Sequence, residues 1–226
     1  MPLDIPRIQA LCFDVDGTLS DTDDLFARMI ARWLRPVRFL FPGRNPLHFA
    51  RRLVIAIESP GNVLFGIPDR LGLDDELAAL VNLMVRLGVG RQPRPFLLVP
   101  SVREMLSQLA MRYPLSIVSV RGERSTRTFL NQFELVPFFQ CIVTGQTCER
   151  TKPYPDPILF AARQMGVAPE ACLMIGDTTV DIRAGRAAGA QTLGVLCGFG
   201  EEAELRRAGA DMILPTTACL HKVLLA

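Results

Sequence analysis

Short apolar runs alternate with helix-like stretches from residue 99 to the end of the chain. The strand-like runs lie at 114–120, 141–145, 172–177, 192–196 and 211–214. Helix-like segments lie at 122–133, near 156–165, near 178–188, near 201–208 and in a short stretch at the C-terminus. Strands that are apolar on both faces and alternate with helices are typical of a parallel sheet covered on both sides. An apolar run at 8–13 has the same character, so the sequence predicts a doubly wound α/β domain.

Residues 21–97 interrupt this alternation. They contain three helix-like segments, near 23–35, 46–57 and 74–87, separated by stretches rich in proline and glycine. No series of strand-like runs accompanies them. The sequence therefore predicts an α/β core made of residues 1–20 and 98–226, with a helical insertion at 21–97 after the first strand.

Composition excludes several classes of protein. The chain has 226 residues, 49% hydrophobic residues and a formal net charge of +2, which fits an ordinary globular protein and gives no sign of a nucleic-acid partner. No apolar stretch is long enough to span a membrane, and the N-terminus lacks the pattern of a secretory signal, so we expect a cytoplasmic protein. The six cysteines include no C-x-x-C pair, which argues against a disulfide or zinc framework.

Chemically active residues follow four of the predicted strands. They are Asp14, Asp16 and Thr18 after the first strand, Ser119 after the second, Lys152 after the third, and Asp177 and Asp181 after the fourth. The carboxyl ends of parallel strands meet at one edge of a sheet, where open α/β folds bind their ligands. We therefore expect these carboxylates, the hydroxyl and the ammonium to share one small site.

This set of side chains suits phosphoryl transfer. Carboxylate oxygens are ligands for Mg²⁺, which can screen the repulsion between an attacking carboxylate and a phosphate ester. In this interpretation Asp14 attacks phosphorus, and Asp16 protonates the leaving alkoxide and later activates water. Lys152 and Ser119 bind phosphoryl oxygens.

Each pattern taken alone also has a purely structural explanation. A D-x-D sequence occurs in solvated turns, and acids such as Asp177 and Asp181 are favoured in the first turn of a helix by its dipole. It is their occurrence together, at successive strand ends, that favours the catalytic interpretation.

These residues resemble the motifs of the haloacid dehalogenase-like (HAD) superfamily of hydrolases. "FDVDGTLSD" is similar to the first motif of that family, Ser119 to the second, Lys152 in "KPYPDP" to the third, and "MIGDTTVDIRAGRAAGA" to the fourth. The resemblance implies a Rossmann-like core, a mobile helical cap at 21–97, and Mg²⁺-dependent hydrolysis of a phosphate ester through an aspartyl-phosphate. A small phosphorylated metabolite is the implied substrate.

The resemblance also implies a role for each matching position. The nucleophile is Asp14 and the general acid/base is Asp16. Mg²⁺ is bound by Asp14, the main-chain carbonyl of Asp16 and Asp177, while Asp181 acts through water or orients Lys152. Substrate contacts are expected from Thr18, Ser119, Val120, Arg121 and Lys152. An acid at position 16 favours a phosphatase, because dehalogenating members typically lack it.

Within the family, phosphoglycolate phosphatase-like members are the most similar. Val120 departs from them, since they often have asparagine there, and this leaves the named substrate open. A phosphomutase or a pyrophosphatase on the same core is an alternative. Another is a weakly catalytic protein that binds an anionic partner through its arginine-rich segment.

That segment contains seven arginines and no acid between Leu25 and Ile57. Arg28, Arg32 and Arg35 would share one face of a helix and repel one another modestly. A solvated or internally paired face is the favoured explanation. Attraction of an anionic substrate is the second, and a membrane surface or nucleic acid the third.

Overall fold

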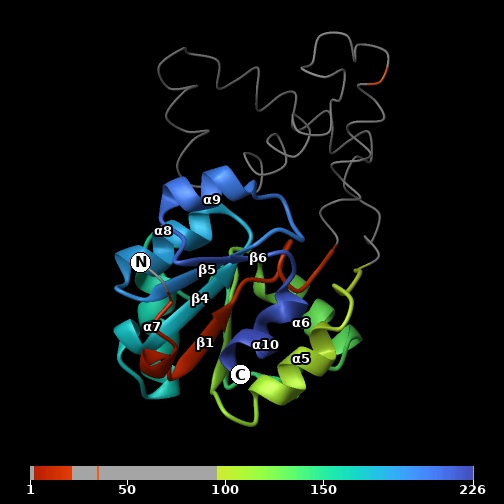
Figure 1. Ribbon diagram of the computed structural model, residues 1–226. Coiled ribbons are helices and arrows are strands. Elements are labelled where there is room, and N and C mark those ends of the chain that lie inside the picture. Colours follow the sequence, from red (N-terminus) through yellow and green to blue (C-terminus); the bar gives the residue numbers. More distant parts are fainter. Residues whose placement is uncertain (1–2, 22–34, 36–95, 226) are drawn as a thin grey trace, which may run out of the picture. The chain divides into compact units, whose positions relative to one another are not determined.

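The computed structural model describes residues 3–21, 35 and 96–225 (Figure 1). The chain divides into one compact unit of residues 1–26 and 96–226 and a second unit of residues 27–95. Apart from Arg35, the second unit lies outside the described residues. The helical insertion and its arginine-rich face therefore stay predictions.

A six-stranded parallel sheet forms the centre of the first unit, in the order β3-β2-β1-β4-β5-β6. The strands are β1 (Ala10–Phe13), β2 (Leu115–Val118), β3 (Cys141–Val143), β4 (Cys172–Gly176), β5 (Gln191–Val195) and β6 (Met212–Leu214). Strand order reverses at β1, which pairs with β2 on one side and β4 on the other. Such a reversal opens a crevice at the carboxyl ends of the strands, and this is where ligands bind in doubly wound sheets.

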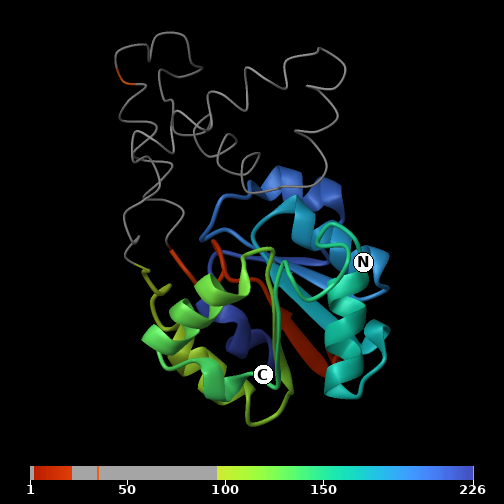
Figure 2. The same cartoon turned by 180° about the vertical axis from the view of Figure 1, so that it is seen from behind.

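Helices cover both faces of the sheet (Figures 1 and 2). They are α5 (Val102–Leu109), α6 (Glu123–Gln132), α7 (Asp156–Met165), α8 (Thr179–Ala187), α9 (Glu202–Ala208) and α10 (Leu220–Leu224). Four short 3₁₀ helices complete the described elements: η1 (Ile5–Arg7), η4 (Val136–Phe138), η5 (Pro169–Ala171) and η6 (Thr217–Cys219). The doubly wound α/β fold predicted from the sequence is confirmed.

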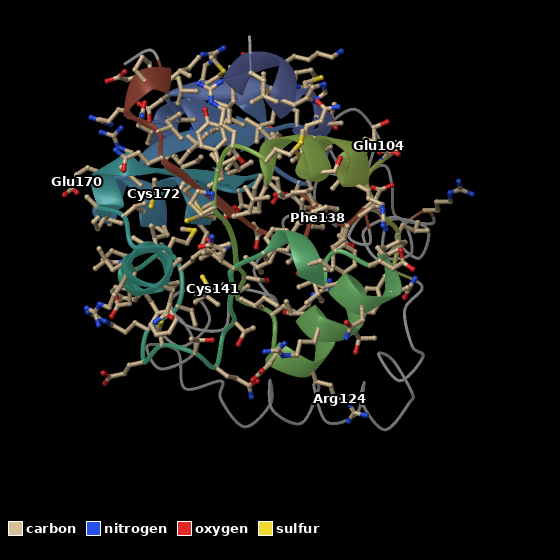
Figure 3. The ribbon with its side chains drawn as sticks, turned by 90° about the horizontal axis from the view of Figure 1, so that it is seen from below. Glu104, Arg124, Phe138, Cys141, Glu170 and Cys172 are labelled. Carbon is tan, nitrogen blue, oxygen red and sulfur yellow. The ribbon has the colours of Figure 1, made fainter. Side chains whose placement is uncertain are left out.

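Side chains alternate between two hydrophobic cores along each strand, as strand geometry requires. On β1, Leu11 and Phe13 face the core formed with α5, α6 and α10. Ala10 and Cys12 face a second core, formed with α7 and α8 and made of smaller side chains. Figure 3 shows Cys141 and Cys172 on this second side, beside α7. Cysteine therefore serves here as a small apolar residue.

Helix α5 was not among the predicted elements, although its pattern is helical. Its buried residues are Val102, Met105, Leu106 and Leu109, spaced as one face of a helix.

Within the described residues, no helix combines the length and the apolar character needed to cross a membrane.

Candidate active site

The chain leaves β1 in a tight turn that carries the first two aspartates. The Asp14 N–H donates to the carbonyl of Ile175 on β4 at 2.9 Å, which extends the sheet by one residue. Gly17 follows with a φ of +69°, and a Cβ there would lie 2.2 Å from Asp177 Oδ2. Glycine is therefore required both by the backbone conformation and by the close approach of a second acid.

Lys152 connects two of the predicted site residues. Its Nζ lies 2.8 Å from Asp14 Oδ1 and 2.6 Å from Asp181 Oδ1. All three side chains are buried, with exposed fractions of 2%, 9% and 1% for Lys152, Asp14 and Asp181. The segment after β3, the end of β1 and the first turn of α8 therefore meet at one point.

Asp181 is held at both of its oxygens. Oδ1 contacts Lys152, while Oδ2 accepts hydrogen bonds from the N–H and the hydroxyl of Thr178, at 3.0 and 2.7 Å. The hydrogen bond from the Thr178 N–H to Oδ2 belongs to a capping box at the start of α8. This explains how a helix start and a buried ion pair can use one carboxylate.

Asp177, at the end of β4, is fully buried and makes no ion pair with any of the described residues. The Phe199 N–H donates to its Oδ2 at 2.7 Å, and the Thr18 hydroxyl lies 3.5 Å from its Oδ1. Space around it is tight, since a Cβ on Gly198 would lie 2.1 Å from Oδ2. The loop after β5 therefore packs directly on this carboxylate.

Carboxylates outnumber cations in this cluster. Ligand atoms of Asp14, Asp177 and Asp181 all lie within 4.8 Å of one another, and Lys152 is the cation paired with them among the described residues. Burial, together with the charges of Asp181 and Asp16, raises the pKa of Asp14 to about 7 despite the attraction of Lys152. Burial also raises the pKa of Asp177 well above its usual value, and Asp181 and Asp14 add to the shift.

Two opposing effects act on the pKa of Lys152. Burial lowers the pKa of its ammonium, but attraction to Asp14 and Asp181 outweighs this effect and the net pKa is raised. Lys152 is therefore charged at neutral pH, and three buried carboxyl groups share this one cation. An all-oxygen set of this kind fits a hard divalent cation such as Mg²⁺.

The residues that follow β2 form a second group. Ser119 is buried, its N–H donates to the Val143 carbonyl at 2.9 Å, and its hydroxyl accepts from the Arg121 N–H at 3.2 Å. Val120 packs closely on the next loop, because a Cβ on Gly145 would lie 2.4 Å from the Val120 carbonyl oxygen. These contacts fix the loop that carries the predicted second motif.

Asp16 does not join the acidic cluster. Arg121 Nε donates to Asp16 Oδ2 at 2.9 Å, and Nη2 pairs with Oδ1. The third nitrogen, Nη1, is buried and has no hydrogen-bond partner among the described residues. Sequence reasoning placed both residues at the site but did not foresee that they pair.

Two further segments support the site and were missed from the sequence. The Cys197 thiol donates to the Gly17 carbonyl at 3.3 Å, and the Thr217 hydroxyl donates to the Thr18 carbonyl at 2.6 Å. They hold the turn after β1 from the side of β5 and β6, while the Phe199 N–H holds Asp177. The closely spaced glycines of "CGFG" after the fifth strand were the available signal, since glycine marks close backbone approach.

Comparisons with known proteins bear on this geometry. Residues 92–195 match the family model described as "Haloacid dehalogenase-like hydrolase". A curated phosphoglycolate phosphatase from Pseudomonas putida is 29% identical over 203 residues, which cover 88% of this chain and 72% of that protein.

Solved structures are similar over nearly the whole chain. A hydrolase from Pseudomonas syringae has a TM-score of 0.71 and 25% identity, covering 95% of this chain and 97% of its own. A HAD family hydrolase from Deinococcus radiodurans R1, solved with bound phosphate and sodium, has a TM-score of 0.66 and 25% identity. The match covers 96% of this chain and 95% of that chain.

Proposed function

Because the chain belongs to the haloacid dehalogenase-like hydrolases, we propose that it is a Mg²⁺-dependent phosphatase that hydrolyses a small phosphorylated metabolite. The observation that carries this proposal is the buried cluster of Asp14, Asp177 and Asp181, in which Lys152 pairs with Asp14 and Asp181. Such an excess of buried carboxylate is costly unless a cation or an anionic substrate with its cation completes the site.

Asp14 is the proposed nucleophile. Lys152 occupies its Oδ1, which leaves Oδ2 to attack phosphorus. A bond from Asp14 to phosphorus forms while the ester P–O bond breaks, and Asp16 gives a proton to the departing alkoxide. Water then attacks the aspartyl-phosphate, Asp16 takes up its proton, and Asp14 and inorganic phosphate are released.

The proposed metal ligands are Asp14, Asp177 and the main-chain carbonyl of Asp16. When bound, Mg²⁺ would screen the repulsion between carboxylate and phosphate and draw negative charge from the transferring group. Both oxygens of Asp181 have protein partners, which supports the view that Asp181 orients Lys152 rather than binding the metal directly.

Ser119 and Lys152 are the proposed ligands of the transferring phosphoryl group, with Val120 and Arg121 beside them. Thr18 was also expected to contact the substrate, but it is fully buried and its hydroxyl faces Asp177. Phosphoglycolate is the first ester to test, since relatives named as phosphoglycolate phosphatases match most of the chain.

The test is phosphate release from phosphoglycolate, from other phosphorylated metabolites and from p-nitrophenyl phosphate, with Mg²⁺ and with EDTA. We expect phosphate release to require Mg²⁺, and its rate to differ between esters according to their alcohol portion. Folded protein that releases no phosphate from any of them, or that returns the phosphoryl group to a second substrate hydroxyl, would contradict the proposal.

A further inference from the structure

The carboxylate of Asp16 is bound by a guanidinium in a two-point contact. Arg121 Nε lies 2.9 Å from Oδ2, and Nη2 pairs with Oδ1. The exposed fractions of the two side chains are 14% for Arg121 and 17% for Asp16. A forked contact fixes the direction of a carboxylate as well as its position, which a single-point contact with lysine does not.

Arg121 is itself held in place. Its guanidinium carbon lies 5.1 Å from the centre of the Phe96 ring, and its N–H donates to the Ser119 hydroxyl at 3.2 Å. Stacking on an aromatic face favours one orientation of the guanidinium plane. The turn after β1 is thereby tied through a rigid arginine to the loop after β2.

From these contacts we infer that Arg121 is a positioning residue, which sets the orientation of Asp16 for proton transfer to the leaving group. Asp16 takes up that proton at one oxygen while the guanidinium holds the other. This inference rests on the proposed phosphatase function and on Asp16 as its acid. Two of the three guanidinium nitrogens are occupied by Asp16, so the arginine acts on the reaction through that carboxylate and not as a ligand of the transferring phosphoryl group.

The inference predicts a selective defect. An alkyl alcohol is a poor leaving group without a proton, whereas p-nitrophenolate departs without one. Loss of Arg121 should therefore slow the transfer step for an alkyl phosphate and have little effect on the same step for p-nitrophenyl phosphate. The parameter to compare is kcat/KM, because it covers the steps up to alcohol departure and excludes later hydrolysis of the aspartyl-phosphate.

The experiment compares Arg121→Gln, Arg121→Lys, Asp16→Asn and the double variant Arg121→Gln/Asp16→Asn, with phosphoglycolate and p-nitrophenyl phosphate as substrates and Mg²⁺ present. For Arg121→Gln we expect kcat/KM to fall by about 10²-fold with phosphoglycolate and by no more than about 3-fold with p-nitrophenyl phosphate. Arg121→Lys should lie in between, since it keeps the charge and loses the fork.

The double variant tests whether Arg121 acts through Asp16. Its kcat/KM for phosphoglycolate should equal that of Asp16→Asn, because partners in one interaction are not additive. Arg127→Gln is the matched control, since it removes an arginine from an exposed pair with Glu123 on α6. Its kcat/KM should equal that of the wild-type protein with both substrates.

Two results would overturn the inference. One is an equal loss of kcat/KM with both esters in Arg121→Gln, while the far-ultraviolet circular dichroism spectrum is unchanged. The other is a kcat/KM for phosphoglycolate in the double variant that is lower than in Asp16→Asn. If the wild-type protein hydrolyses neither ester, it is the proposed function that fails, and this outcome is distinct from the first two.

Discussion

Two ion-pair groups lie at the carboxyl edge of the sheet, and they differ in burial and in charge balance. Lys152 is shared by Asp14 and Asp181, with exposed fractions of at most 9% for these side chains. Arg121 and Asp16 form a one-to-one pair that is 14% and 17% exposed. A single residue, Val15, separates Asp14 from Asp16 along the chain, yet the two carboxylates enter different electrostatic environments.

The difference separates two tasks. In the first group, the carboxyl groups outnumber the cation, and burial together with the neighbouring acids raises the pKa of Asp14 and Asp177. A surplus of carboxyl groups favours binding of an added cation. In the second group the charges balance, and the geometry of the fork fixes a side chain. The first group suits covalent and metal chemistry, and the second suits the directed movement of a proton.

The largest effect is expected from Asp14→Asn. The amide cannot attack phosphorus, so turnover should fall by about 10⁴-fold or more. The melting temperature of the Mg²⁺-free protein should change little, because the variant removes one of several mutually repelling acids. Asp4→Asn is the matched control, since Asp4 is exposed and its side chain makes no cap hydrogen bond. Retained turnover in Asp14→Asn would exclude Asp14 as the nucleophile.

Lys152→Met tests the unequal charge balance directly. It leaves Asp14 and Asp181 buried without their cation, so unfolding free energy without Mg²⁺ should fall by about 3–5 kcal/mol. Activity should fall by about 10²- to 10³-fold.

Arg121→Gln is the comparison for Lys152→Met, and it should cost less than half as much stability, because its pair is nearer to solvent. Urea unfolding of both variants measures the difference. Equal destabilisation would mean that the two groups do not differ as their burial indicates.

The two groups also differ in how far the sequence could predict them. Predicted strands followed by Asp14, Lys152 and Asp181 were enough to place the first group, because the carboxyl ends of parallel strands meet at one edge of the sheet. The predicted strands are all observed, and α7 was predicted with the bounds Asp156–Met165 that the structure shows.

The pairing of Asp16 with Arg121 was beyond this reasoning. It depends on the turn at Gly17 and on the path of the loop after Ser119, which set side-chain directions that residue type and periodicity do not encode. The Phe199 N–H on Asp177 was missed for the same reason, since every residue except proline carries a backbone donor and its target is decided by the loop conformation.

A smaller effect is expected where the loop after β5 meets the acidic cluster. In Gly198→Ala, the new Cβ would lie 2.1 Å from Asp177 Oδ2 and 2.6 Å from the Gly17 carbonyl oxygen, so the carboxylate must move. The Mg²⁺ concentration for half-maximal activity should rise about 10- to 100-fold. Gly122→Ala is the control, since the nearest atom to its Cβ is Gln146 Oε1 at 3.7 Å. A Mg²⁺ requirement equal in both variants would contradict Asp177 as a ligand.

The smallest effect is a change in the response to Mg²⁺ with pH. The pKa of Asp14 is raised from 3.8 to about 7, first by burial and then by Asp181 and Asp16. Between these values the folded protein binds more protons than the unfolded chain, so the contribution of Asp14 to stability is full below pH 3.8 and is lost as the pH rises through about 7.

A cation binds the ionised carboxylate and must displace that proton at low pH. Mg²⁺ should therefore raise the melting temperature by more at pH 8 than at pH 5.5, as measured by differential scanning fluorimetry with and without EDTA. In Asp14→Asn this pH dependence should be weaker, whereas in Arg121→Gln it should persist, because Arg121 contacts Asp16 and not the cluster. An equal Mg²⁺ effect at both pH values in the wild-type protein would show that the buried acids do not bind the ion, and the contrast between the two ion-pair groups would then be one of burial alone.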